Sequence, residues 1–258
     1  MKMITSELLE MSYDQLVNYY LKKYGKVKYD FFHTPTCVSV QKKNSRTKEG
    51  LEIHHIDEDK YHNLSSKAYA LKAPFECQKA ERLVYVNVLE HLLLHIKICE
   101  EENERRIIKG QQASYTNIGE IFLSFRINDY FSKKSFANWH EDMARVIRNN
   151  FDDYIMELVY SLTLFSKYHP EKLLAEINGS ALKWDGTTNL RVLRALRNKC
   201  LNILPIKVGD HIKHSVYGKG FVDKICFFTD SFIVFDVMFE NKKITTISSD
   251  EEFELLKS

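Results

Sequence analysis

Two short stretches decide the fold of this chain: LEIHHI at residues 51–56 and LVYVNVLEHLLLHIK at residues 83–97. The first reads as a strand, and the second opens with four β-branched, aromatic or aliphatic residues that read as another strand. Apolar residues at helical spacing follow, and Asn87 with Glu90 three residues later resembles a capping box. The two stretches therefore predict strand, strand and helix, with the helix ending near Arg106.

Four histidines lie on these predicted elements. His54 and His55 are neighbours on a strand, so their side chains point to opposite faces. His91 and His95 are four residues apart on a helix, so both rings project from one face and can bind one metal ion. One strand histidine would complete a three-histidine site with open positions. The other is left as general base, because an imidazole with a pKa of about 6.5 accepts a proton from water at neutral pH.

Each histidine pair taken alone is more often an ordinary set of polar residues than a ligand set. The helical pair, however, is surrounded by Leu92, Leu93, Leu94 and Ile96, which indicates a buried helix. Buried histidines need polar partners, and a metal ion provides one.

Together these residues resemble the ββα-metal, or HNH, nuclease motif, and closely its colicin-type DNase version, over about 45 residues. The resemblance implies that His54, His91 and His95 hold the metal ion and that His55 is the general base. It also implies that Glu52 orients a ligand or the bound phosphate. The wider run, residues 49–59, resembles HNH proteins of bacteria, phages and mobile elements, which implies phage defence, restriction or mobile-element biology.

The chain departs from this family at one position. The middle Asn of the motif ties down the loop that carries the base, and here Arg82 stands in its place, nine residues before His91. Two residues are candidates for the tether: Asn63, in the polar excursion between the strands, and Arg82 itself, donating to a backbone carbonyl. The excursion is longer than usual, and its acidic start, residues 57–59, is expected to be a solvated loop.

The resemblance thus implies a metal-dependent HNH endonuclease that hydrolyses DNA and, as this family usually does, leaves a 5′-phosphate and a 3′-hydroxyl. An RNase stays open, since a metal site is indifferent to the sugar. Three imidazoles suit Zn²⁺ or Ni²⁺, whereas Mg²⁺ or Mn²⁺ is expected in operation because of its availability. Residues 1–50 carry nine Lys or Arg against five Asp or Glu, so DNA is expected to contact this part of the chain. The candidate backbone contacts are Lys42, Lys43, Arg46 and Lys48.

The rest of the chain predicts an α+β protein, with a mostly helical body carrying the ββα-metal motif and a small C-terminal SH3-like β-barrel. Sparse Gly and Pro (9 and 4) favour helices, including one over residues 6–24, whereas short apolar β-rich runs follow residue 205. The predicted domains are an HNH nuclease domain with its N-terminal helix at 1–110, a helical domain at 111–203 and the barrel at 204–258.

The C-terminal segment resembles the SH3-like or Tudor-like module of UvrD-type helicases and CarD-type transcription factors, through the pattern from Gly209 to Val222. The resemblance implies a protein partner, or nucleic acid, bound through residues 205–258. It also leaves an alternative function open: a catalytically weak or inactive HNH-like protein recruited to nucleic-acid machinery through the barrel, which the Arg82 departure favours. A barrel without a ligand and a homo-oligomer also stay open.

The five cysteines are scattered and form no Cys-x-x-Cys pair, which argues against a zinc knuckle or a disulfide framework and suits a reducing cytoplasm. No run approaches the roughly 20 apolar residues of a membrane span. We therefore expect a cytoplasmic protein with no membrane partner.

Overall fold

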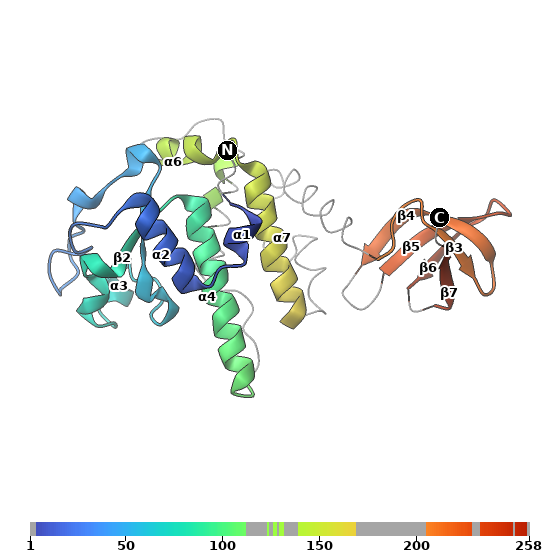
Figure 1. The fold of residues 1–258 in the computed structure, drawn as a ribbon, viewed down its shortest axis with the longest axis horizontal. Helices are drawn as coiled ribbons and strands as arrows, with labels where there is room; N and C mark the ends of the chain where they lie inside the picture. Colours follow the sequence, from blue (N-terminus) through green and yellow to red (C-terminus); the bar gives the residue numbers. More distant parts are fainter. Residues whose placement is uncertain are drawn as a thin grey trace. The chain divides into compact units, whose positions relative to one another are not determined.

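The computed structural model describes residues 4–111, 123, 126–127, 129–131, 139–168, 205–228, 233–249 and 251–256. The chain separates into two compact units, residues 1–161 and 162–258, and contains both helices and sheets, as the α+β prediction requires (Figure 1). The boundary predicted at residues 110/111 does not separate these units, because helix α6 (Trp139–Ile147) belongs to the first unit. Most of the predicted helical domain at 111–203 lies outside the described residues.

The first unit carries a two-stranded sheet among helices. Its described elements besides α6 are α1 (Ser6–Leu9), α2 (Tyr13–Tyr24), η1 (Lys42–Asn44), η2 (Thr47–Glu49), β1 (Glu52–His55), η3 (Ile56–Asp59), α3 (Lys67–Ala70), η4 (Phe75–Gln78), η5 (Ala80–Arg82), β2 (Leu83–Val86), α4 (Val88–Ile108) and the start of α7 (Phe151–Tyr168).

The N-terminal helix predicted over residues 6–24 is wrong in one respect, because the structure has two helices, α1 and α2. Ser12 separates them with an extended backbone, and its hydroxyl accepts a hydrogen bond from the backbone N–H of Gln15. The Gln15 side chain accepts in turn from the backbone N–H of Ser12, which completes a capping box. This local cap begins a new helix where the apolar spacing predicts a continuous one.

Strands β1 and β2 and helix α4 lie where the sequence predicts two strands and a helix. The strands pair antiparallel, with His54 opposite Val84 and His55 opposite Leu83. All four residues of β2 are buried. The polar excursion between the strands contains η3, α3, η4 and η5 and returns the chain to the edge of β1.

Helix α4 begins with the predicted capping box. The Asn87 side chain accepts from the backbone N–H groups of Leu89 and Glu90, and the Glu90 carboxylate accepts from the backbone N–H of Asn87 at 2.9 Å. The same carboxylate accepts from Lys23 at 2.6 Å, which joins the end of α2 to the start of α4. The predicted capping role of Glu90 is therefore confirmed, and its position between two helices fixes how α2 and α4 pack.

The second unit contains a five-stranded antiparallel sheet in the order β6-β5-β4-β3-β7. Its strands are β3 (His211–His214), β4 (Gly218–Phe228), β5 (Ile233–Phe239), β6 (Ile244–Ser248) and β7 (Phe253–Leu256). Buried side chains from four of these strands form a core of their own, centred on Phe235, Val237 and Ile212. In the part of the chain that the structure describes, no helix combines the length and apolar character needed to cross a membrane.

Candidate metal centre

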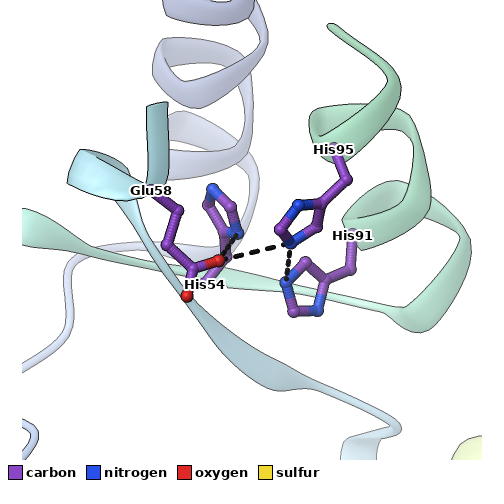
Figure 2. A group of neighbouring side chains, drawn as sticks. All are labelled: His54, Glu58, His91 and His95. Atoms are coloured by element: carbon purple, nitrogen blue, oxygen red, sulfur yellow. Dashed lines mark hydrogen bonds and ion pairs between the residues drawn. The ribbon is translucent and has the colours of Figure 1, made fainter. Parts of the chain in front are cut away.

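Three of the predicted histidines and one glutamate converge in the first unit (Figure 2). His54 comes from β1, His91 and His95 from α4, and Glu58 from η3. One ligand atom from each lies within 4.8 Å of all the others. We call these four residues the metal group, because imidazole nitrogens and carboxylate oxygens are the atoms that hold divalent metals in proteins.

The hydrogen bonds of Tyr13 decide which nitrogen of His54 faces the metal group. The Tyr13 hydroxyl donates to the carbonyl of Ile56 at 2.8 Å, so its remaining contact, 2.7 Å from His54 Nε2, must be one in which His54 donates. The Nε2 proton leaves Nδ1 with a lone pair. Nδ1 is buried, has no hydrogen-bond partner among the residues that the structure describes, and lies 3.6 Å from Glu58 Oε2.

Glu52 determines which nitrogen of His91 carries the proton. Its Oε1 lies 2.6 Å from His91 Nδ1 and 2.5 Å from Arg126 Nη2. Burial would raise the pKa of Glu52, but Arg126 and His91 together lower it to about 2. The ionised carboxylate therefore accepts a hydrogen bond from His91 Nδ1–H, and the lone pair of His91 lies on Nε2, which faces His95.

Glu58 and His95 complete the metal group. His95 Nε2 lies 3.3 Å from His91 Nε2 and 3.3 Å from Glu58 Oε2. Burial opposes the ionised form of Glu58, yet the hydrogen bond from His95 holds its pKa far below the usual range. Glu58 is only 7% exposed, and so is Asp57, so the expectation of a solvated acidic loop is wrong at these two positions.

The metal group fits a divalent ion. Burial lowers the pKa of His54 and, against the charge of Glu52, that of His91, so both rings stay neutral as metal ligation requires. Three of the six separations between the ligand atoms, 3.3, 3.3 and 3.6 Å, equal the edges of a tetrahedron with ligand bonds of 2.0–2.2 Å, about 3.3–3.6 Å, and all six lie within 4.8 Å. Two anchored imidazoles and a buried, unpartnered nitrogen are what a metal would need and what a purely structural polar cluster would avoid.

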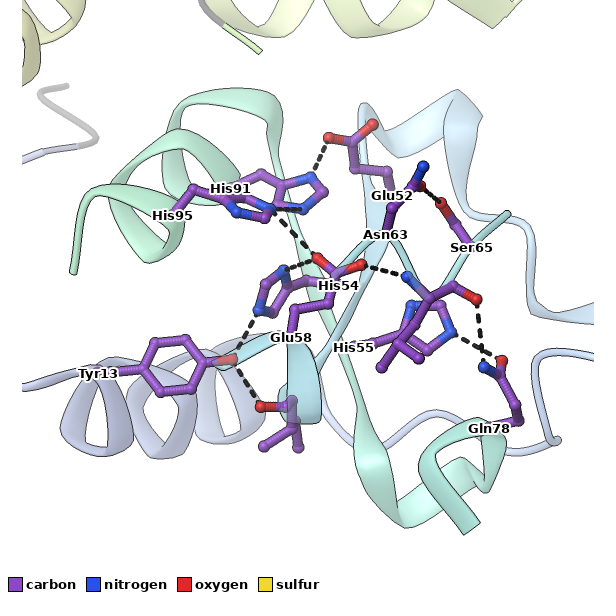
Figure 3. A network of polar contacts seen from close by, with 12 residues as sticks. Tyr13, Glu52, His54, His55, Glu58, Asn63, Ser65, Gln78, His91 and His95 are labelled. Carbon is purple, nitrogen blue, oxygen red and sulfur yellow. Dashed lines mark hydrogen bonds and ion pairs between the residues drawn. The ribbon is translucent and has the colours of Figure 1, made fainter. Parts of the chain in front are cut away.

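His55 lies away from the metal group on the other side of β1 (Figure 3). Its ring packs against Phe31, with centroids 4.5 Å apart, and its Nε2 lies 3.0 Å from Gln78 Oε1. Burial lowers the pKa of His55, although Glu58 and Gln78 act in the opposite direction. The ring is therefore neutral near pH 7 and able to accept a proton.

The two candidates for the loop tether occupy different places. Asn63 is exposed, has a left-handed backbone (φ 54°), and accepts from the Ser65 hydroxyl at 3.3 Å. Arg82 donates to the carboxylate of Asp57, with its Nε 2.7 Å from Oδ2 and its Nη2 in contact with Oδ1. Arg82 thus holds the segment just after His55, but through a carboxylate and not through the backbone carbonyl that was expected.

The four basic residues before β1 are not equivalent. Arg46 is committed to the fold, because its guanidinium donates to the Glu49 carboxylate and to the Tyr24 carbonyl and lies over the Tyr85 ring. The other three side chains are exposed and are available for a phosphate backbone: Lys42, Lys43 and Lys48.

Sequence reasoning missed Tyr13, Glu58 and Gln78. Glu58 lies four residues after His54, a spacing that could have been noticed, although nothing marks it apart from the two acidic residues beside it. Tyr13 and Gln78 reach the site from α2 and η4, and no spacing in the sequence indicates either contact.

Comparisons of the chain with protein-family models, with curated proteins and with solved structures find no match, so the case for function rests on the geometry given above.

Proposed function

We propose that this protein is a metal-dependent endonuclease of the HNH type that hydrolyses DNA phosphodiester bonds. The observation that carries the proposal is the buried Nδ1 of His54, which has a lone pair, forms no hydrogen bond with any described residue and faces three further ligand atoms. The order β1, β2, α4 along the chain, with the histidines at the predicted places on them, supports the likeness to the ββα-metal motif.

The metal group would hold the ion through the nitrogens of His54, His91 and His95 and an oxygen of Glu58. When bound, a divalent ion supplies positive charge that stabilises the developing negative charge on the scissile phosphate and the leaving oxygen. Tyr13 and Glu52 keep the coordinating nitrogens free of protons and the rings in place. Nitrogen donors suit Zn²⁺, Ni²⁺ or Mn²⁺, and the carboxylate brings the site closer to what Mn²⁺ or Mg²⁺ accepts.

His55 is the proposed general base. As its neutral ring takes the proton from water, the water oxygen forms a bond to phosphorus and the bond from phosphorus to the 3′-oxygen breaks. The products would be a 5′-phosphate and a 3′-hydroxyl. Burial lowers the pKa of His55, so the ring is unprotonated at neutral pH, as a general base must be before the reaction.

Substrate contacts are proposed for the exposed lysines of the basic loop, Lys42, Lys43 and Lys48. Each would neutralise phosphate charge without reading a base, so their removal should weaken binding and reduce its salt dependence. Arg46 is left out of this set because its donors are engaged within the fold.

The second unit is proposed to be the SH3-like or Tudor-like module, which would bind a protein partner. Its first strand, β3, pairs with its last, β7, and the long β4 pairs with both β3 and β5. Two register shifts in the β4–β5 pairing would let β4 bend and serve two faces of a small barrel.

Plasmid cleavage tests the nuclease proposal. Wild type and His55→Ala are incubated with supercoiled DNA in Mg²⁺, Mn²⁺, Zn²⁺ or EDTA, and a matched RNA is digested in parallel. We expect wild type to cut DNA with at least one metal and not in EDTA, and His55→Ala to cut about 10²- to 10⁴-fold more slowly. Intact DNA with every metal, or equal cutting by His55→Ala, would contradict the proposal, and cleavage of RNA alone would replace DNase with RNase.

A further inference from the structure

Gln78, at the end of η4, is fully buried between His55 and the excursion that follows β1. Its Nε2 lies 3.2 Å from the carbonyl oxygen of Leu64, and its Oε1 lies 3.0 Å from His55 Nε2. A carbonyl only accepts hydrogen bonds, so the amide NH₂ must face Leu64 and the amide oxygen must face His55. His55 therefore donates from Nε2, and its lone pair lies on Nδ1.

The same hydrogen bonds continue to the metal group (Figure 3). The backbone N–H of Leu64 donates to Glu58 Oε1 at 2.9 Å, while the other oxygen of Glu58 lies 3.3 Å from His95 Nε2. An unbroken sequence of contacts thus runs from His95 through Glu58, Leu64 and Gln78 to His55. Leu64 and Gln78 are both 0% exposed, so water does not compete for these hydrogen bonds.

We propose that Gln78 is the positioning residue of the nuclease site, which fixes the tautomer and the ring orientation of His55 so that Nδ1 is the atom that accepts the proton from water. The inference rests on the proposed function. It assigns to Gln78 the tethering role for which Asn63 and Arg82 are the candidates in the sequence. Asn63 bonds to Ser65 and Arg82 to Asp57, whereas Gln78 contacts the ring of His55 itself.

The link to Glu58 adds a second consequence. Because Glu58 belongs to the metal group and also accepts from Leu64, a shift of its carboxylate is transmitted to the carbonyl that orients Gln78. Buried hydrogen bonds therefore link His55 to the metal group, in addition to strand β1, which carries both His54 and His55.

Two substitutions separate the contact with His55 from the contact with Leu64. Gln78→Met removes both, because a thioether neither donates to a carbonyl nor accepts well from an imidazole N–H. Gln78→Glu keeps an acceptor for His55 Nε2 and loses the donor to Leu64. Gln111→Met, at an exposed position beyond α4, is the matched control.

The tautomer of His55 is read directly from long-range ¹H–¹⁵N correlation spectra of full-length protein with ¹⁵N-labelled histidine, in which His55→Ala identifies the signal. We expect the Nε2–H form in wild type, Gln78→Glu and Gln111→Met, and a mixture of forms in Gln78→Met. Cleavage should fall about 10- to 100-fold in Gln78→Met and recover at least in part in Gln78→Glu. Metal affinity should change less than about threefold in both, which shows that the fold and the metal group are retained.

Three results would overturn the inference: an unchanged His55 tautomer in Gln78→Met, wild-type cleavage by that variant, or equal loss of cleavage in Gln78→Met and Gln78→Glu. The last would assign Gln78 to holding Leu64 alone. Should wild type cleave no nucleic acid, the nuclease proposal fails, and the tautomer measurement still decides whether Gln78 controls His55.

Discussion

At the scale of single residues, the metal centre depends on which nitrogen of each histidine carries a proton. The Tyr13 hydroxyl and the Glu52 carboxylate make that choice for His54 and His91, and both are part of the buried structure around the site. The Tyr13 hydroxyl donates to the Ile56 carbonyl, and the Glu52 carboxylate accepts from Arg126. Each can therefore only accept a hydrogen bond from its histidine. Two residues outside the metal group thus determine which nitrogen atoms of His54 and His91 are free to bind a metal ion.

Tyr13→Phe tests this choice. Without the hydroxyl, His54 can move its proton to Nδ1, and the lone pair is lost from the metal group. We expect metal affinity to fall about 10- to 100-fold with the fold retained, measured by titration calorimetry. Tyr20→Phe, on the same helix, is the matched control, because the buried Tyr20 hydroxyl bonds to none of the residues described in the structure. Equal affinity in wild type and Tyr13→Phe would contradict the assignment.

The sequence could predict the histidines but not the residues that tune them. His54 and His91 stand out because their spacing fits a strand and a helix, which are local features. Tyr13 and Gln78 are separated from the histidines they contact by 41 and 23 residues, respectively. Those contacts depend on how α2 and η4 pack, and a single sequence carries no record of that packing. Glu58 was missed for a different reason: an acidic run is usually solvated, and here it is buried against histidines.

At the scale of elements, β1 is positioned from outside the two-stranded sheet by α6. Gly50, just before β1, has φ +74°, and a Cβ added there would lie 2.2 Å from the Cγ2 of Val146 on α6. Only a glycine therefore allows both the left-handed turn and the close approach of the helix. Sequence analysis placed α6 in a separate domain because the region between α4 and α6 shows no motif that links them.

Gly50→Ala should destabilise the first unit. The control is Gly110→Ala, at the left-handed C-terminal end of α4, where φ is +67° and the added methyl group meets open space. Both variants carry the backbone strain, and only Gly50→Ala adds the clash with Val146. We expect Gly50→Ala to lower the free energy of unfolding by about 1–3 kcal/mol more than Gly110→Ala does, measured by urea denaturation. Equal losses of unfolding free energy in the two variants would show that Val146 on α6 does not exclude a side chain at position 50.

The elements themselves were well predicted where the pattern is local. Strands β1 and β2 and the capping box of α4 each follow from a short run whose own residue types favour a strand or a helix cap. The helix over residues 6–24 was not, because its apolar spacing continues through Ser12 while the Ser12 side chain caps a new helix. The hydrogen bond of the Ser12 side chain thus begins a new helix at a place where the apolar spacing alone favours a continuous one.

At the scale of the whole molecule, stability is expected to depend on a carboxyl group outside the metal centre. Glu157 on α7 is fully buried, and within the described parts of the chain neither of its oxygens has a hydrogen-bond partner. Burial, with the charges of Asp153 and Glu90, raises its pKa well above the usual value. The folded protein therefore keeps a proton on Glu157 that the unfolded chain loses above about pH 4.5.

Stability should accordingly fall as pH rises from about 4.5 toward the raised pKa of Glu157, by at most about 1.4 kcal/mol per pH unit from this group. Glu157→Gln removes that dependence, so the variant should gain stability over wild type between pH 5.5 and pH 8. Urea denaturation in EDTA at both pH values measures the difference. Asp152→Asn, an exposed carboxyl group on the same helix, should show a constant difference from wild type. A constant difference for Glu157→Gln would show that Glu157 is ionised in the folded protein.

The central claim is that one ion, held by the metal group, is required for cleavage. The most direct test measures bound ions per chain and the initial rate of plasmid cleavage on the same samples, as metal-stripped protein is titrated with Mn²⁺. We predict that the wild-type rate rises from zero and levels off at one ion per chain, and that His91→Ala, which lacks one ligand, stays near zero over that range. Cleavage by the metal-free protein, or no cleavage when one ion per chain is bound, would contradict the account.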